Sequence, residues 1–126
     1  MKTSRSDFVV IGSGLAGLAF ALKAAPLGKV TIVTKDSAPS ANTSWAQGGI
    51  AAVMGSDDSF ESHIHDTLRA GAGLCKEEVV RDYINQAPER IKELMNWGVH
   101  FDFKGDTQEM DLTREGGHSF RRVLHF

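Results

Sequence analysis

The feature that most constrains this chain is a glycine-rich turn set between two short apolar runs. Residues 12–17 read Gly-Ser-Gly-Leu-Ala-Gly, which is the pattern G-x-G-x-x-G. Residues 8–11 before it predict a buried strand, and residues 14–25 predict an Ala- and Leu-rich helix. Residues 30–34, rich in β-branched side chains, predict a second strand. A strand, helix and strand within about 30 residues form a βαβ unit with parallel strands, so the sequence predicts an α/β fold of the Rossmann type.

Each glycine of the pattern has a separate physical task. Gly12 makes the tight turn off the strand, Gly14 lets the backbone approach a pyrophosphate, and Gly17 lets helix and strand pack closely. The helix start adds N–H groups and a partial positive charge for phosphates. We therefore interpret the turn as a dinucleotide site, against the alternative of a glycine-rich turn without a ligand.

The end of the second predicted strand is where a ribose is expected. An acidic residue is usual there, about 20 residues after the glycines. This chain has Thr34-Lys35-Asp36, and Asp36 is able to bond ribose hydroxyls. The spacing alone leaves Lys35 open between a phosphate or adenosine contact and a solvated strand-end lysine.

Beyond the βαβ unit the pattern is mainly helical. Residues 36–56 predict a long irregular segment, and loops of that length are usually functional. A helix is expected from Asp58, with Asp58 and Glu61 at capping-box spacing, ending at Gly71. Residues 76–97 have helical periodicity, and Pro88 favours two short helices over one kinked helix.

The remaining segments are less regular. The pattern of residues 99–103 and 110–112 predicts a hairpin, and residues 113–126 are polar with a Gly-Gly break. The chain has 126 residues, room for one ordinary domain, and we treat residues 1–126 as part of one nucleotide-binding domain.

Composition excludes several classes of partner. The net charge is −2, with acids and bases scattered, so nucleic acid is not an expected partner. The apolar stretch from Phe8 to Leu22 is too short to span a bilayer, and Asp7 and the patterned glycines argue against a signal peptide. The single cysteine, Cys75, suits a reducing compartment, so a cytoplasmic location without a membrane partner is expected.

A second unusual segment covers residues 42–52, Asn-Thr-Ser-Trp-Ala-Gln-Gly-Gly-Ile-Ala-Ala. It offers amide and hydroxyl groups, then a flexible Gly-Gly pair and a small apolar run. Such groups suit hydrogen bonding to a polar ring edge with close approach of the backbone. An ordinary irregular loop is the alternative interpretation.

Taken together, five segments in this order resemble a known family. They are VVIGSGLAGL, a strand ending in Thr-Lys, TSWAQGGIAAV, DTLRAGAGLC and LTREGGHSFRRVLH. The chain resembles the succinate dehydrogenase and fumarate reductase flavoprotein superfamily, and within it the L-aspartate oxidases, from Asp7 to His125. The resemblance implies FAD and proteins of several hundred residues.

The resemblance also implies roles for individual residues. Ser13, Gly14, Leu15 and Ala16 match the pyrophosphate turn, and Lys35 matches a lysine that aspartate oxidases place at this strand end. The segment that lies along the flavin is matched by Asn42, Thr43, Ser44, Trp45, Ala46, Gln47, Gly48 and Gly49. Membrane-bound relatives carry a histidine, covalently attached to the flavin, at the position of Asn42. Asn has no imidazole nucleophile, so non-covalent FAD is expected.

Glu115 is the candidate substrate residue. It resembles the glutamate that orients the substrate near its amino group in aspartate oxidases. Aspartate differs from succinate by one ammonium, and a carboxylate is its natural partner. An exposed loop acid is the alternative.

Other polar residues have weaker patterns. His118 is open between a substrate contact and a loop-capping role, whereas Arg114, Arg121 and Arg122 suit anions but are expected to be solvated or supporting residues. His63 and His65 do not share a helix face, so no metal site is expected. Cys75 is expected to be a small buried apolar group rather than a nucleophile.

The implied reaction is oxidation of L-aspartate to iminoaspartate, the first step of one bacterial route to NAD, with oxygen or fumarate reoxidising the flavin. The family's capping and C-terminal helical domains, its substrate histidines and its catalytic arginine have no counterpart here, and Phe126 departs from the small residue usual after Leu-His. Two alternatives stay open: a superfamily member acting on succinate or fumarate, and a truncated, non-catalytic nucleotide-binding remnant. We also expect the isolated chain to be marginally stable.

Overall fold

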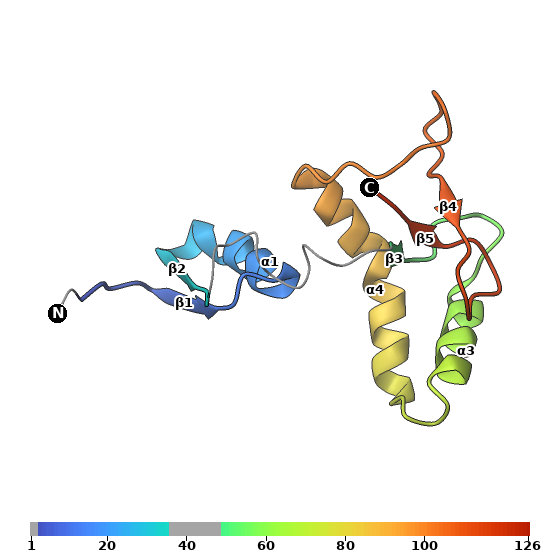
Figure 1. Ribbon diagram of the computed structural model, residues 1–126, viewed down its shortest axis with the longest axis horizontal. Coiled ribbons are helices and arrows are strands. Elements are labelled where there is room, and N and C mark those ends of the chain that lie inside the picture. The colour runs from blue at the N-terminus through green and yellow to red at the C-terminus, as the bar shows by residue number, and fades with distance from the viewer. Residues whose placement is uncertain (1–2, 36–48) are drawn as a thin grey trace. The chain divides into compact units, whose positions relative to one another are not determined.

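The computed structural model describes residues 3–35 and 49–126, and the chain divides into two compact units (Figure 1). Unit 1 is Met1–Gln47 and unit 2 is Gly48–Phe126. Each unit is a separate arrangement of helix and strand, and each is described by itself below.

Unit 1 is the βαβ unit that the glycine pattern predicts. It contains β1 (Phe8–Ile11), α1 (Leu15–Ala24), a 3₁₀ turn η1 (Ala25–Leu27) and β2 (Val30–Val33). The two strands are parallel, with Phe8 paired to Val30 and Ile11 to Val33. The α/β fold and the parallel sheet expected from the sequence are confirmed.

The apolar side chains of unit 1 are incompletely covered. Only Val10, Ala21 and Ala24 are buried among the apolar residues of its described part. Phe8 and Phe20 meet edge to face with ring centroids 6.4 Å apart, which joins β1 to α1. The large apolar residues that stay exposed are Val9, Ile11, Leu15, Leu18, Phe20, Leu22, Leu27, Ile32 and Val33. A parallel sheet is normally covered on both faces, so the exposure of so many apolar side chains around β1 and β2 is unusual.

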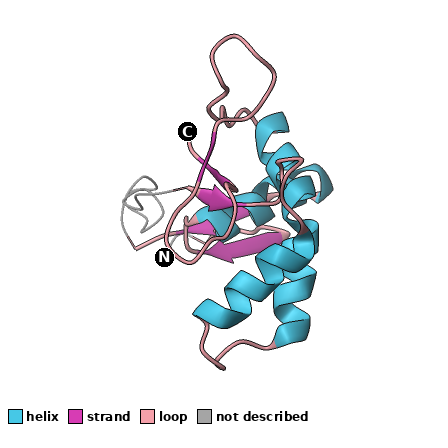
Figure 2. Cartoon of the chain, turned by 90° about the vertical axis from the view of Figure 1, so that its right-hand side faces the viewer, coloured by secondary structure: helices cyan, strands magenta, loops and turns pink. Residues whose placement is uncertain are grey.

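Unit 2 packs two helices with a small antiparallel sheet (Figure 2). The helices are α3 (Phe60–Ala70) and α4 (Glu77–Asn96). The sheet has the order β3-β5-β4, formed by β3 (Ile50–Ala51), β5 (Val123–Leu124) and β4 (Leu112–Thr113). The hydrophobic core of unit 2 consists of Ala52, Ile91, Phe101, Leu112 and Leu124.

Pro88 does not divide α4, so the prediction of two short helices is wrong. The helix runs from Glu77 to Asn96 with Pro88 inside it (Figure 1). Proline removes one backbone hydrogen bond and costs a helix interior about 3 kcal/mol. Ile84 and Ile91 are both buried, seven residues apart on one stripe, and the burial of this continuous stripe offsets the cost.

The start of α3 also differs from the prediction. Ser59 is the N-cap, and its Oγ accepts a hydrogen bond of 3.2 Å from Ser62 N. The helix therefore begins after Ser59, and Asp58 does not cap it because its carboxylate binds Arg122.

The predicted hairpin is present in reduced form. Phe103 and Met110 form an isolated antiparallel bridge, and Asp111 N donates to Asp102 O at 2.9 Å. The regular strand β4 begins two residues after that bridge and pairs with β5 instead. The strands β3 and β5 were not predicted, because two-residue strands carry no periodicity.

Candidate functional site

The glycine turn of unit 1 has the backbone that its sequence predicts. Gly12 has φ +104°, a conformation that side-chain-bearing residues rarely adopt, and its N–H donates to Val33 O at 2.8 Å. Gly14 is the N-cap of α1, so the helix starts without a side-chain acceptor, and its first turn has no acidic residue. The partial positive charge of this helix start is therefore not offset by a local carboxylate.

Gly17 is required for packing. A Cβ at Gly17 would collide with the carbonyl oxygen of Gly12 and approach Val10 Cγ1 at 3.3 Å. The absence of a side chain lets α1 cross directly over the turn, as the pattern predicts. Because Val10 is buried below it, this contact also joins the helix to β1.

The other residues of the predicted pyrophosphate site lie at the same end of the parallel pair. Ser13 is buried, and its Oγ donates to Thr34 Oγ1 at 3.3 Å. Leu15 and Ala16 begin α1, and Lys35 is exposed two residues after the end of β2 at Val33. The carboxyl ends of parallel strands lie at one sheet edge, so the turn after β1 and the residues after β2 follow the same edge. Asp36 lies outside the described residues.

The second glycine segment is described only at its end. The residues of this segment that lie outside the described part of the chain are Asn42, Thr43, Ser44, Trp45, Ala46, Gln47 and Gly48. Gly49 lies directly before β3, and a Cβ there would collide with Leu124 O and Val123 Cγ1 of β5. Packing against β5 thus explains why residue 49 is glycine.

Glu115 follows β4 and has a half-exposed side chain. Its Oε1 lies 3.9 Å from His125 Nε2, and the same nitrogen lies 2.7 Å from Thr113 Oγ1. Ile50 pairs with Leu124 in the antiparallel register of β3 and β5, and one further step places Gly49 opposite His125. The register thus places the end of the second glycine segment beside His125, and the side chain of His125 reaches Thr113 and approaches Glu115. Sequence reasoning did not single out His125, and no spacing signal marks it.

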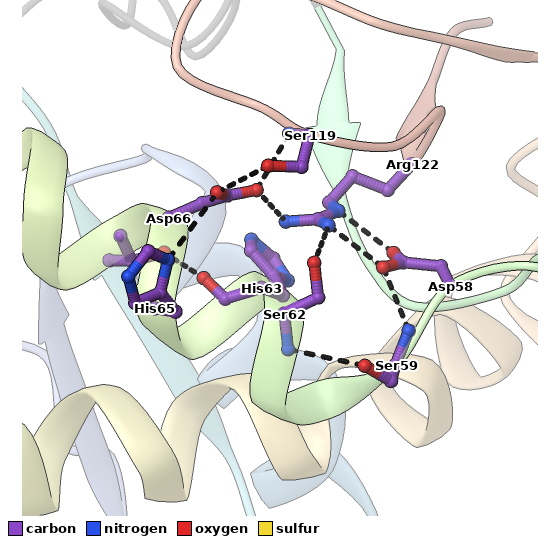
Figure 3. A network of polar contacts seen from close by, with 9 residues as sticks. Asp58, Ser59, Ser62, His63, His65, Asp66, Ser119 and Arg122 are labelled. Carbon is purple, nitrogen blue, oxygen red and sulfur yellow. Dashed lines mark hydrogen bonds and ion pairs between the residues drawn. The ribbon is translucent and has the colours of Figure 1, made fainter.

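A buried ion-pair network lies beside this sheet (Figure 3). Arg122 Nε and Nη2 donate to the two carboxylate oxygens of Asp58, each at 2.8 Å, and Nη1 donates to Asp66 Oδ2 at 3.1 Å. The side chains of Arg122 and Asp58 have no solvent exposure. Of the two expectations for Arg122, a solvated residue is wrong, and a supporting residue agrees with its pairing to two buried carboxylates.

Asp66 joins this network to the loop that carries Glu115. Ser119 N and Ser119 Oγ both donate to the Asp66 carboxylate at 2.7 Å. Burial opposes ionisation of Asp66, but the hydrogen bonds from Ser119 and the Arg122 guanidinium outweigh it and hold its pKa below the usual value. The carboxylate is therefore charged and anchors the loop to α3.

His118 lies against His63 of α3, with ring centroids 5.7 Å apart and planes tilted by 59°. In the described part of the chain, the buried Nδ1 atoms of both rings have no hydrogen-bond partner. Burial, then the charge of Arg122 and the neighbouring His118, lowers the pKa of His63 to about 4. His63 is thus a neutral buried group at pH 7.

The remaining candidates show no site chemistry of their own. Arg114 and Arg121 are exposed and line an open hollow with Asp57. Cys75 is partly buried, with Sγ 3.9 Å from Thr67 O. Within residues 3–35 and 49–126, no group of three or more His, Cys, Asp or Glu is placed to hold a metal, and no helix is long and apolar enough to cross a membrane.

Known proteins resemble this chain along nearly its whole length. The sequence model of a family described as "FAD binding domain" matches residues 7–126. The chain is 50% identical over 123 residues to "L-aspartate oxidase, chloroplastic" of Oryza sativa, covering 98% of the chain and 19% of that protein. It is 50% identical over 128 residues to "L-aspartate oxidase" of Vibrio cholerae, covering 98% and 24%. The chain thus spans about a fifth to a quarter of the length of these curated relatives.

Solved structures agree in fold. A structure of Mycobacterium smegmatis Sdh1 matches with a TM-score of 0.89 and 34% identity over 99% of this chain and 21% of that one. The Escherichia coli quinol fumarate reductase FrdA matches with a TM-score of 0.88 and 33% identity, covering 98% and 22%. The sequence relatives and the structural relatives thus differ in the reactions that their names describe.

Proposed function

Because this chain belongs to the FAD-binding domain family, we propose that it is the nucleotide-binding part of an FAD-dependent L-aspartate oxidase. The observation that carries this proposal is the exposed carboxylate of Glu115 just after β4, with its Oε1 3.9 Å from His125 Nε2. Sequence identity of about 50% to proteins named L-aspartate oxidase supports the same substrate.

The cofactor is FAD, and the residues present fit it. A positive-φ glycine, a helix start without an acidic residue and the close approach at Gly17 make a turn suited to a pyrophosphate. We propose that residues 12–17 hold the pyrophosphate and that Lys35 supports the adenosine side. When bound, the flavin supplies the two-electron acceptor. Asn42 lacks an imidazole nucleophile, so we propose that the flavin is held without a covalent bond.

Glu115 would then select an amino dicarboxylate. Its carboxylate receives the substrate ammonium, an interaction that succinate and fumarate do not make. Oxidation removes a hydride from the substrate Cα and a proton from its nitrogen, which gives iminoaspartate. Oxygen or fumarate would then reoxidise the flavin. The reaction would be the first step of one bacterial route to NAD. We place the reaction in the cytoplasm.

Succinate or fumarate chemistry is the second candidate. The similarity to Sdh1 and FrdA at 33–34% identity favours it, because those names describe dehydrogenase and reductase proteins. Glu115 favours aspartate over these acids, since neither of them carries an ammonium group.

A two-step experiment tests the proposal. First, the 126-residue chain is mixed with FAD, desalted, and examined for retained flavin absorbance and for bleaching by aspartate without oxygen. We expect no bleaching, because the chain spans about a fifth of its relatives. Bleaching would show instead that the chain is a minimal oxidase.

Second, residues 7–126 replace the matching stretch of the Vibrio cholerae L-aspartate oxidase. We expect a hybrid that retains FAD and oxidises aspartate, and Glu115→Gln should raise its KM for aspartate on the order of tenfold or more. A hybrid that retains FAD but acts on succinate alone contradicts the proposed substrate. The non-catalytic remnant is favoured if the folded hybrid oxidises neither acid.

A further inference from the structure

We propose that His125 is a positioning residue for Glu115, and that its imidazole, fixed by the Thr113 hydroxyl, holds the carboxylate where it meets the substrate ammonium. The inference rests on the proposed function, because it assigns a partner to the substrate residue of that site. It gives a role to His125, a residue to which the sequence analysis assigned none.

The sheet places His125 by its register. Leu112 pairs with Leu124, and Thr113 pairs with Val123. Directly opposite residues share a face, so Leu112 and Leu124 face the core while Thr113 and Val123 lie on the other face. Because side chains alternate between the two faces along β5, the side chain of His125 lies on the same face as those of Val123 and Thr113.

The backbone of His125 is fixed as well. Its carbonyl oxygen accepts a hydrogen bond of 2.9 Å from Asp102 N, which extends the pairing beyond β5. The neighbouring Leu124 is almost completely buried in the core. The imidazole therefore projects from a rigid strand end, and its position does not depend on the loop that carries Glu115.

One imidazole nitrogen lies between two oxygens. Nε2 is 2.7 Å from Thr113 Oγ1, a hydrogen-bond distance, and 3.9 Å from Glu115 Oε1, a contact that becomes an ion pair when the ring is protonated. The Thr113 hydroxyl both donates and accepts, so it satisfies Nε2 whichever tautomer is present. The ring is thus oriented by Thr113 and remains within reach of the carboxylate.

Glu115 needs such a partner because its side chain is half exposed. A free glutamate side chain loses rotamer entropy when it is fixed. A neighbouring His125 restricts those rotamers before the substrate arrives, so less entropy is lost on binding. The effect is confined to substrates that use Glu115, which means those with an ammonium group.

The test uses the Vibrio cholerae hybrid carrying residues 7–126, with His125→Gln and Thr113→Val. Exposed ion pairs contribute modestly, so each variant should raise KM for aspartate about two- to fivefold with kcat little changed. Fumarate reduction should stay at the parent rate. The matched control is His100→Gln, which replaces an exposed histidine of unit 2 and should change neither reaction.

A double-mutant cycle separates positioning from general damage. In the Glu115→Gln background, His125→Gln should have no further effect on KM, because the carboxylate that it positions is gone. Equal effects of His125→Gln in both backgrounds, or equal losses with aspartate and fumarate, would overturn the proposal. A parent hybrid that fails to oxidise aspartate defeats the proposed function instead, so the two failures are distinguishable.

A second measurement does not depend on activity. In the 126-residue chain, ¹H–¹⁵N spectra of the His125 ring should show a shifted Nε2 resonance in Thr113→Val and again in Glu115→Gln. His100→Gln should leave that resonance unchanged. A His125 ring resonance that ignores both substitutions contradicts the contact itself.

Discussion

In unit 1 the strand residue Ile11 is 88% exposed, whereas in unit 2 the strand residue Leu124 is 1% exposed. Both units contain helices and paired strands, but unit 1 leaves most of its large apolar side chains uncovered. Unit 2 encloses a core and a buried ion-pair network. The nucleotide turn of unit 1 therefore forms from local sequence while the sheet beside it leaves apolar side chains exposed. Unit 2 buries its apolar side chains within its own core.

The largest expected effect is on unit 2 and comes from Arg122→Ala. This change leaves the carboxylates of Asp58 and Asp66 buried without their cation, which should cost about 3–5 kcal/mol. Hydrogen-exchange mass spectrometry should show lost protection in peptides of unit 2 and unchanged exchange in unit 1. Arg121→Ala removes the adjacent exposed arginine and should have little effect. Equal loss in both units would show that their stabilities are coupled and would break the comparison.

The next largest effect is on unit 1 and comes from Gly17→Ala. The new methyl group would meet the Gly12 carbonyl oxygen, so α1 must move away from the turn, at a cost of about 1–3 kcal/mol. Exchange in unit 1 should rise and flavin retention should fall, while unit 2 stays protected. Gly116→Ala is the control, because its Cβ would have open space around it. Unchanged exchange in unit 1 would show that the close approach does not stabilise it.

A smaller effect separates the units by pH. His63 has a native pKa of about 4, below the value of 6.5 for a free imidazole, so the unfolded chain binds more protons between these values. Stability of unit 2 should therefore be fully present above pH 6.5 and fall as the pH drops toward 4, by about 1–3 kcal/mol. The lowered pKa of Asp66 adds a further loss below its usual range.

His63→Gln should flatten the upper part of this pH profile, as followed by urea unfolding with Trp97 fluorescence in a Trp45→Phe background, which leaves Trp97 as the single tryptophan. His100→Gln should leave the profile unchanged, because that histidine is exposed. A slope between pH 6.5 and 4 that survives the loss of His63 would falsify the assignment.

The two units also differ in how far the sequence predicts them. The turn at residues 12–17 and the strands around it depend on neighbours in the chain, so a local pattern predicts them correctly. The Arg122 network joins residues 56 to 64 positions apart, and no local pattern indicates such a partner. Pro88 shows the same limit, because a local rule predicted a break that the packing of Ile84 and Ile91 overrides.

The candidate site residues also differ in how far the sequence predicts them. Gly12 and Gly17 have the backbone geometry that the glycine pattern predicts, because the βαβ unit brings its own residues together. His125 reaches Thr113 across β4 and β5, two strands too short to give a signal, and its side chain there approaches Glu115. The roles of Glu115, Lys35 and residues 42–49 remain predictions.

The smallest expected effect tests the start of α3, where the sequence and the structure name different caps. Ser59→Ala removes the acceptor for Ser62 N and should destabilise unit 2 by about 1 kcal/mol, measured by urea unfolding.

If Asp58 were a cap alone, Asp58→Ala would cost a similar amount. Because Asp58 holds two nitrogens of a buried arginine, its loss should cost several times more, on the order of 3–5 kcal/mol. Ser56→Ala, on an exposed residue before the helix, is the control and should be neutral. Equal costs for Asp58 and Ser59 would mean that the ion pair contributes little, and the contrast between an open unit 1 and a unit 2 held by buried charge would lose its main support.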